Sequence, residues 1–172
     1  MVVLDDTFWT NNAINNTITT TSNLEITGGS IPNNKVLVID TYTVTIEASN
    51  FKIHPDGELH IQNEGSLVVS YNTKLTNTGI ILHKTSDSNS NIQAITIQSG
   101  GKINNGVSGF LLSNNPITDA SGNAINTVTA VKNLNKNIEI KNGNTLQIGS
   151  NGQLNILNGN TLTVKNGGSV TV

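Results

Sequence analysis

The fold of this chain is decided by residues 137–172, which read NIEIKNGNTLQIGSNGQLNILNGNTLTVKNGGSVTV. The stretch is one eight-residue phrase written about four and a half times: polar, apolar, polar, apolar, and then a four-residue turn rich in Asn and Gly. Alternation over four residues is typical of a β-strand, and a fixed period is typical of repeats that bury their apolar faces against one another. Residues 137–172 therefore predict regular β repeats.

Each phrase contributes one pair of apolar residues and one turn. The pairs are Ile138/Ile140, Leu146/Ile148, Leu154/Ile156, Leu162/Val164 and Val170/Val172. The turns carry the dipeptides Asn142-Gly143, Asn151-Gly152, Asn158-Gly159 and Asn166-Gly167. Because Asn and Gly tolerate positive φ angles, we expect these dipeptides to form the sharp corners between strands.

The same spacing recurs in the first half of the chain. Its apolar pairs are Val36/Val38, Val44/Ile46, Phe51/Ile53, Leu59/Ile61 and Leu67/Val69, separated by steps of eight, seven, eight and eight residues. The period is lost between residues 106 and 135, where turns such as Asn114-Asn115-Pro116 predict an irregular insertion with Phe110, Leu111 and Leu112 beneath it. We expect one domain over residues 1–172: a cap or assembly segment at 1–30, the insertion at 106–135 and regular repeats at 137–172.

Two all-β folds can use this pattern. In a parallel β-solenoid every apolar pair points into the coil, and equivalent positions stack about 4.8 Å apart. In an antiparallel meander or β-sandwich, a two-residue hairpin at Asn142-Gly143 would place Ile140 opposite Thr145, although a three-residue loop would restore matching faces. The strands are uniformly short and aromatic residues make up only 3%. We therefore predict the parallel solenoid and retain the antiparallel meander or sandwich as the alternative.

The number of strands in one coil is left open by the repeat. The phrase beginning at Asn142 returns at Asn158, which is a period of 16 residues. Two eight-residue strands would give coils of 16 residues and three would give coils of 24.

The composition restricts the classes of partner and of structure. Charged residues make up 12%, the net charge is −2, and all nine basic residues are Lys, which disfavours nucleic acid as a partner. There is no Cys, and the 29 Asn, 22 Thr and 20 Ile favour strands and turns, so no helix is predicted. No window approaches the roughly 20 apolar residues of a membrane span, and the start of the chain lacks a secretory signal pattern.

The densest group of ionisable residues is His54-Pro55-Asp56-Gly57-Glu58-Leu59-His60. The repeat phase places Glu58 and His60 outward and His54 and Asp56 on a corner, where a metal contact or a pH-sensitive patch is conceivable. A solvated corner is the favoured interpretation, because zinc sites usually show tighter spacing. The eleven acidic residues are scattered, so we predict no catalytic, cofactor or metal site and no enzyme activity.

Two further motifs give little support to a specific function or modification. Thr41, Thr43 and Thr45 resemble the Thr arrays of ice-binding solenoids, but the outward positions of the tail vary too much for such a face. Asn15-Asn16-Thr17 matches a glycosylation acceptor, and one accidental match is expected in a chain so rich in Asn and Thr.

The stretch Asn160-Thr161-Leu162-Thr163-Val164-Lys165-Asn166-Gly167-Gly168 resembles the passenger repeats of bacterial and viral β-helix surface proteins. That resemblance is specific for fold and covers the regular part of the chain. It implies a fibre, adhesin or spike that is extracellular, on the cell surface or on a virion surface.

The last repeat, Ser169-Val170-Thr171-Val172, carries no cap in the sequence. A terminal coil exposes backbone groups and core, so we expect it to meet either another subunit or a further part of a larger protein. We favour the first, a second copy of the chain stacked head to tail. The expected interface residues are Val2, Val3, Leu4, Phe8, Trp9, Val170 and Val172. The predicted function is a structural, self-assembling fibre subunit. The alternatives are an adhesin, in which residues 106–135 bind a glycan or a receptor, and, less favoured, an ice-binding protein.

Overall fold

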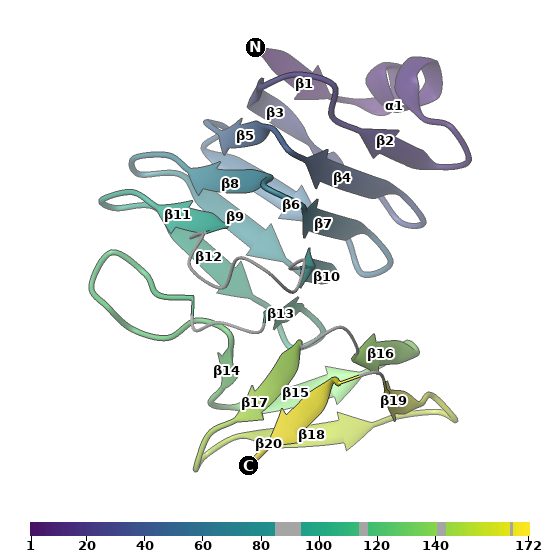
Figure 1. Cartoon of the computed structure of the whole chain (residues 1–172), viewed down its shortest axis with the longest axis vertical. Coiled ribbons are helices and arrows are strands. Elements are labelled where there is room, and N and C mark those ends of the chain that lie inside the picture. The colour runs from purple at the N-terminus through teal and green to yellow at the C-terminus, as the bar shows by residue number, and fades with distance from the viewer. Residues whose placement is uncertain (85–93, 114–116, 141–143, 166) are drawn as a thin grey trace.

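The chain forms a parallel β-solenoid of about seven turns (Figure 1). The structure is a computed structural model that describes residues 1–84, 94–113, 117–140, 144–165 and 167–172. Every ladder between two strands in these ranges is parallel. The predicted solenoid is therefore confirmed, and the antiparallel alternative is wrong.

The first two thirds of the chain form one stack of coils, which we call the N-terminal stack. Its eight-stranded sheet contains β1 (Val2–Leu4), β3 (Leu24–Ile31), β5 (Thr43–Ile46), β6 (Asn50–Ile53), β8 (Ser66–Val69), β9 (Lys74–Asn77), β11 (Ile95–Ile97) and β12 (Lys102–Asn105). Its five-stranded sheet contains β2 (Thr17–Thr19), β4 (Val36–Asp40), β7 (Glu58–Gln62), β10 (Ile80–Lys84) and β13 (Phe110–Leu112). Strand β3 pairs with β5 through Leu24–Ile26 and with β6 through its last two residues, so the larger sheet makes two of the three faces.

The remaining strands form a second, shorter stack, which we call the C-terminal stack. It contains β14 (Thr127–Val128), β15 (Val131–Leu134), β16 (Ile138–Ile140), β17 (Thr145–Ile148), β18 (Gln153–Ile156), β19 (Leu162–Val164) and β20 (Ser169–Thr171). Ile138 pairs with Leu162 and Thr145 pairs with Ser169, both 24 residues further along. One coil of this stack therefore contains three eight-residue phrases, which answers the question that the repeat left open.

The corners of the C-terminal stack use Asn and Gly in two ways. Asn158 and Gly159 have φ angles of 52° and 72°, as predicted. Gly152 does not have a positive φ; a Cβ there would lie 2.1 Å from the carbonyl oxygen of Val128, so this glycine is required by close approach of the backbone. The predicted corners at Asn142-Gly143 and at Asn166 lie outside the described residues.

Residues 106–135, expected to be an irregular insertion, contain the strands β13, β14 and β15. Between β13 and β14, Thr118 and Ala124 form an isolated antiparallel bridge, and Ile117 packs into the core of the N-terminal stack. The predicted turn Asn114-Asn115-Pro116 lies outside the described residues.

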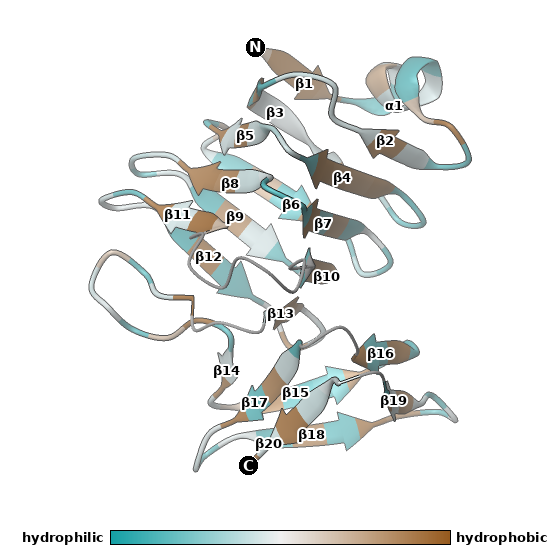
Figure 2. Cartoon of the chain, in the orientation of Figure 1, coloured by the Kyte–Doolittle hydropathy of each residue, from teal (hydrophilic) through white to brown (hydrophobic). Residues whose placement is uncertain are grey.

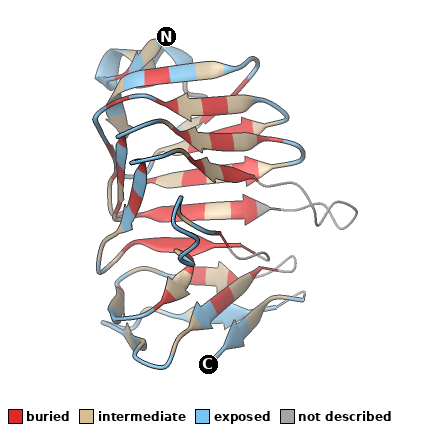
Figure 3. Cartoon of the chain, turned by 90° about the vertical axis from the view of Figure 1, so that its left-hand side faces the viewer, coloured by how far each residue is buried: buried red, intermediate tan, exposed pale blue. Residues whose placement is uncertain are grey.

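Side chains alternate between the inside and the outside of the coils, as red and pale segments of the strands in Figure 3 show. The two stacks have separate cores. Leu111 of β13 belongs to the core of the N-terminal stack, in one column with Leu37, Leu59 and Ile81. Its neighbours Phe110 and Leu112 belong to the core of the C-terminal stack. Strand β13 thus contributes side chains to both cores.

One helix, α1 (Asp6–Asn12), covers the N-terminal end of the solenoid, so the prediction of no helix is wrong. Asp5 is its N-cap: Oδ1 accepts a hydrogen bond of 2.8 Å from the backbone N–H of Phe8. Trp9 is buried against the first coil and donates from Nε1 to the carbonyl of Ser30. A cap and one buried aromatic residue stabilise two helical turns that the low helix propensity of the chain does not predict.

Candidate functional site

The predicted ionisable cluster lies on the outward side of β7 and the corner before it. Leu59 and Ile61 point into the core, so Glu58 and His60 point outward, and His60 Nε2 lies 2.6 Å from Glu58 Oε2. His54 is half-buried at the corner, where burial and, to a lesser degree, Lys52 lower its pKa. Among the described residues no three His, Cys, Asp or Glu side chains are grouped so that they could hold a metal ion.

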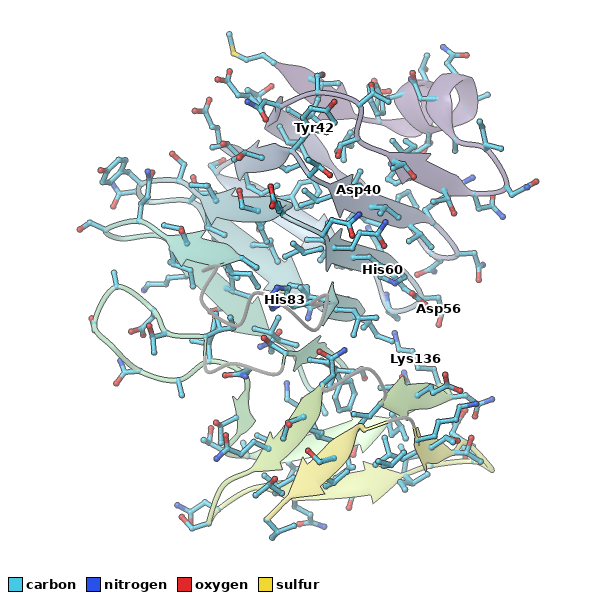
Figure 4. All side chains as sticks on the ribbon, in the orientation of Figure 1. Asp40, Tyr42, Asp56, His60, His83 and Lys136 are labelled. Carbon is cyan, nitrogen blue, oxygen red and sulfur yellow. The ribbon has the colours of Figure 1, made fainter. Side chains whose placement is uncertain are left out.

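Lys136, which the sequence did not single out, lies on the same side as this cluster (Figure 4). Its Nζ is buried and has no hydrogen-bond partner among the described residues. Burial lowers the pKa of Lys136, and the carboxylates of Asp56 and Glu58 act in the opposite direction. The cluster is therefore a mixed group of charges at which Lys136 of the C-terminal stack lies near Asp56 and Glu58.

His83 lies apart from this cluster, because it points inward (Figure 4). It occupies the position that Ile39 and Ile61 occupy in the two coils above it. Its Nδ1 lies 3.0 Å from the Oγ of Ser113, and burial lowers its pKa. Both side chains are buried, so this Ser–His pair offers no surface to a substrate.

The predicted interface residues at the N-terminal end divide into two groups. Leu4 and Trp9 are buried in the core of their own chain. Val2 and Phe8 are half-buried against it, and Val3 is exposed. Leu4 and Trp9 thus cap the first coil of their own chain.

A groove opens between α1 and β2. Its volume is about 610 Å³, and its lining combines apolar side chains such as Phe8, Ile14 and Leu24 with Thr and Ser residues. Ile14, which lines the groove, is 78% exposed. Strand β2 is the outermost strand of its sheet, with β4 as its strand neighbour in the described structure. The groove therefore combines exposed apolar surface with the edge of a sheet.

The opposite end of the molecule exposes three parallel strand edges, which we call the C-terminal edge. Within the described ranges, β18, β19 and β20 each have one strand neighbour, in the coil above. Leu157, Lys165 and Ser169 donate their backbone N–H groups to that coil. Because backbone groups alternate along a strand, Ile156, Val164 and Val170 direct theirs to the open side.

The side chains of the C-terminal edge are also accessible. Ile156 is 51% exposed, Val164 is 45% exposed and Val170 is 37% exposed. The equivalent residues one coil earlier, such as Leu134 and Ile140, are completely buried. The last described coil therefore leaves uncovered the apolar surface that the preceding coil buries.

A cleft of about 560 Å³ lies between the two stacks. Most of its lining comes from the predicted binding segment 106–135, including Val107, Thr127 and Thr129. Lys132 donates from Nζ to the carbonyl oxygens of Asn105, Gly106 and Gly109, with distances of 3.2 Å to Asn105 and 2.9 Å to Gly109. Burial lowers the pKa of Lys132 to about 8. The cleft has the size of a small-ligand site, with polar groups set in an apolar lining.

The Thr positions do not continue as an array through the stack. Thr45 is followed in its column by Val68 and then by Thr96, and in the tail Glu139 is followed by Thr163. A flat Thr face of the kind that ice binding requires does not form at these positions.

Comparisons of this chain with protein-family models, curated proteins and solved structures gave no match. Among the described residues, no helix has the length and apolar character that a membrane span requires.

Proposed function

We propose that this protein is a structural subunit that assembles through its coil ends into a fibre, outside the cell or on a virion surface. The observation that carries the proposal is the C-terminal edge, where β18, β19 and β20 direct unpaired backbone groups and exposed Ile156, Val164 and Val170 away from the molecule. Adding one coil would pair these groups and bury the side chains, at about 1.5–3 kcal/mol for each large apolar side chain fully buried.

The groove between α1 and β2 is the partner surface that supports a head-to-tail arrangement. Since Leu4 and Trp9 are buried in their own chain, we place the contact on exposed Ile14 and on the edge of β2 instead. The groove supplies exposed apolar side chains beside the outermost strand of a sheet, which complement the exposed apolar side chains of the C-terminal edge. Both backbone groups of Thr17 already bond to Ile14, so β2 offers a partner strand only the part of its edge beyond Thr17. A contact between two different surfaces gives a filament when the rotation from one copy to the next does not close a ring, as in coils stacked along one axis.

A mixing experiment with two variants tests this arrangement. In Val164→Pro the lost N–H is one that faces the open side, so the ladder within the subunit is retained while the edge is blocked. In Ile14→Lys the groove is blocked. We expect the wild-type protein to form filaments in electron micrographs, each variant alone to stay monomeric in analytical ultracentrifugation, and an equal mixture to form dimers.

Two outcomes contradict the proposal. Dimers of Ile14→Lys alone would mean that two C-terminal edges pair symmetrically, and wild-type protein that stays monomeric at high concentration would reject assembly altogether. Tyr71→Lys is the matched control, because Tyr71 is an exposed apolar residue on a coil corner away from both ends. It should form filaments like the wild type.

A second candidate function is ligand binding in the cleft between the stacks, as in an adhesin carried on a solenoid stalk. The observation in its favour is that residues 106–132 supply most of the lining. Ala130→Trp should fill the cleft and abolish binding on a glycan array while leaving filaments intact, whereas Ser150→Trp, on an exposed turn, should change neither. Equal binding by Ala130→Trp and wild type would exclude the cleft as the binding site.

A further inference from the structure

Three of the nine lysines lie together on one flat face of the N-terminal stack. Lys52, Lys74 and Lys102 project outward from β6, β9 and β12, and all three side chains are exposed. We call this surface the lysine face. Figure 2 shows hydrophilic segments along β6 and β12.

The register of the strands brings these charges close together. Lys74 and Lys102 occupy the same column, one directly above the other, so their backbones are about 4.8 Å apart. Lys52 lies in the adjacent column, with Thr76 and Asn104. Like charges at opposed positions repel, so the column of Lys74 and Lys102 costs the folded protein some stability.

The described structure supplies little charge to neutralise this face. The other outward residues of its two columns, from β3 to β12, are Ser30, Asn50, Thr76 and Asn104, all of them uncharged. None of the ion pairs between described residues involves Lys52, Lys74 or Lys102. The face is therefore a compact positive surface on a protein whose net charge is −2.

One carboxylate borders the lysine face. Asp119 lines, with Lys102, a hollow of about 240 Å³ at the lower end of the face. Its Oδ1 accepts hydrogen bonds from the backbone N–H groups of Ser121 and Asn123, and the side chain of Asn123 donates to both carboxylate oxygens. Those bonds lower the pKa of Asp119 and hold its carboxylate within its own turn.

The adjacent face of the same stack is different. Its outward residues at the corresponding central column are Glu25, Thr45, Val68 and Thr96, without a lysine. Of these two faces, only the lysine face carries lysines at these outward positions.

We propose that the lysine face binds a linear anionic polysaccharide, such as a chain of uronic acids. Successive carboxylates of such a chain can meet Lys74 and Lys102, while its hydroxyl groups hydrogen-bond to Thr76 and Asn104. A rigid stack holds these groups at regular spacing before the ligand arrives, which lowers the entropic cost of binding.

The chemistry of the face favours a polysaccharide over two other anionic partners. The outward residues carry no apolar side chain that would insert into a lipid surface. They also include no aromatic residue on which a base could stack, and the chain has no Arg. Thr76 and Asn104 also line the cleft between the stacks, so this face borders the cleft. Lys74 and Lys102, which the test changes, line neither the cleft nor the groove and lie away from the C-terminal edge.

Binding to polygalacturonate tests the proposal. Lys74→Gln/Lys102→Gln removes two charges from the face, and the matched control Lys35→Gln/Lys165→Gln removes two exposed or half-exposed charges elsewhere. We expect the wild type and the control to bind alike and the first variant to bind about tenfold more weakly. Binding of the wild type should weaken when the ionic strength rises from about 0.01 M to 0.1 M, since the Debye length falls from roughly 30 to 10 Å. Circular dichroism should show both variants folded.

Three outcomes overturn the proposal. The first is the absence of wild-type binding to polygalacturonate, and the second is an equal loss in both double variants, which would indicate diffuse attraction. The third is tighter binding to anionic vesicles or to single-stranded DNA than to polygalacturonate, which would assign the face to a membrane or to a nucleic acid. A neutral dextran should not bind.

Discussion

Phe110 and Leu111 are consecutive residues of β13, yet they lie in different hydrophobic cores. Leu111 faces the inside of the N-terminal stack, and Phe110 faces the C-terminal stack. Phe110 stands in the same outward column as Glu58 and Ile80 of the coils above. The outer surface of one sheet thus becomes an inner surface of the second stack.

The two cores predict different responses to truncation of these neighbours. Phe110→Ala should lower the free energy of unfolding by about 3–5 kcal/mol, and Leu111→Ala should lower it by about 2–5 kcal/mol. Hydrogen exchange should accelerate mainly in β16 and β17 in the first variant and mainly in β7 and β10 in the second. The same pattern of exchange in both variants would show that the two cores unfold as one.

Lys132 should stabilise the junction between the stacks. Lys132→Met keeps the aliphatic part of the side chain but leaves three backbone carbonyl groups without their donor. The free energy of unfolding, measured with urea, should therefore fall by about 1–3 kcal/mol. Lys165→Met is the control, because it removes only an exposed pair with Glu139 and should change stability by less than about 1 kcal/mol. Equal effects would argue against a structural role for Lys132.

Stability should fall in mild acid because of His83. Burial lowers the pKa of this side chain from its ordinary value of 6.5, so the unfolded chain takes up a proton at a higher pH than the folded protein does. The free energy of unfolding should therefore be highest above pH 6.5 and should decrease as the pH falls through that value. His83→Ile, which continues the column of Ile39 and Ile61, should show a smaller decrease between pH 7.5 and pH 5. An unchanged slope would contradict this assignment.

Two glycines should differ sharply in their tolerance of alanine. A Cβ at Gly79 would lie 2.1 Å from the carbonyl oxygen of Gly57 in the coil above, so Gly79→Ala should prevent normal stacking or lower the melting temperature strongly. A Cβ at Gly122 would meet nothing within 4 Å. The φ of +83° at this residue is then the only source of strain, and Gly122→Ala should lower the free energy of unfolding by about 1–2 kcal/mol. A comparison of the two melting temperatures checks the contrast, and equal values would contradict it.

The sequence predicts the coil because the alternation that defines each strand involves only neighbouring residues. Alternation within pairs such as Leu59/Ile61 and Leu146/Ile148 depends only on which side chains face inward, and uniformly short strands at a fixed period favour parallel stacking. The register of Ile138 with Leu162 required the structure, since an eight-residue phrase fits two or three strands per coil.

The features that sequence reasoning missed depend on contacts between distant residues. Nothing near Phe110 or Leu112 signals that their outward side will be covered by a second stack. Lys74 and Lys102 are 28 residues apart in sequence, and only the paths of the intervening coils bring them into one column. The period becomes irregular around His83, so the sequence does not predict that this side chain continues the inward column of Ile39 and Ile61.

The break between the two stacks has a mechanical consequence. Within each stack the coils are joined by continuous ladders of backbone hydrogen bonds, but no ladder of the described strands runs from β12 or β13 into β14–β20. The backbone and side-chain bonds that cross include those from Asn133 to Val107, from Thr145 to Ser113 and from Lys132. Under tension along its long axis, the molecule should therefore yield first at this joint. Separation would uncover Ile80, Phe110 and Leu112 and open the core of the C-terminal stack, while the core of the N-terminal stack stays packed.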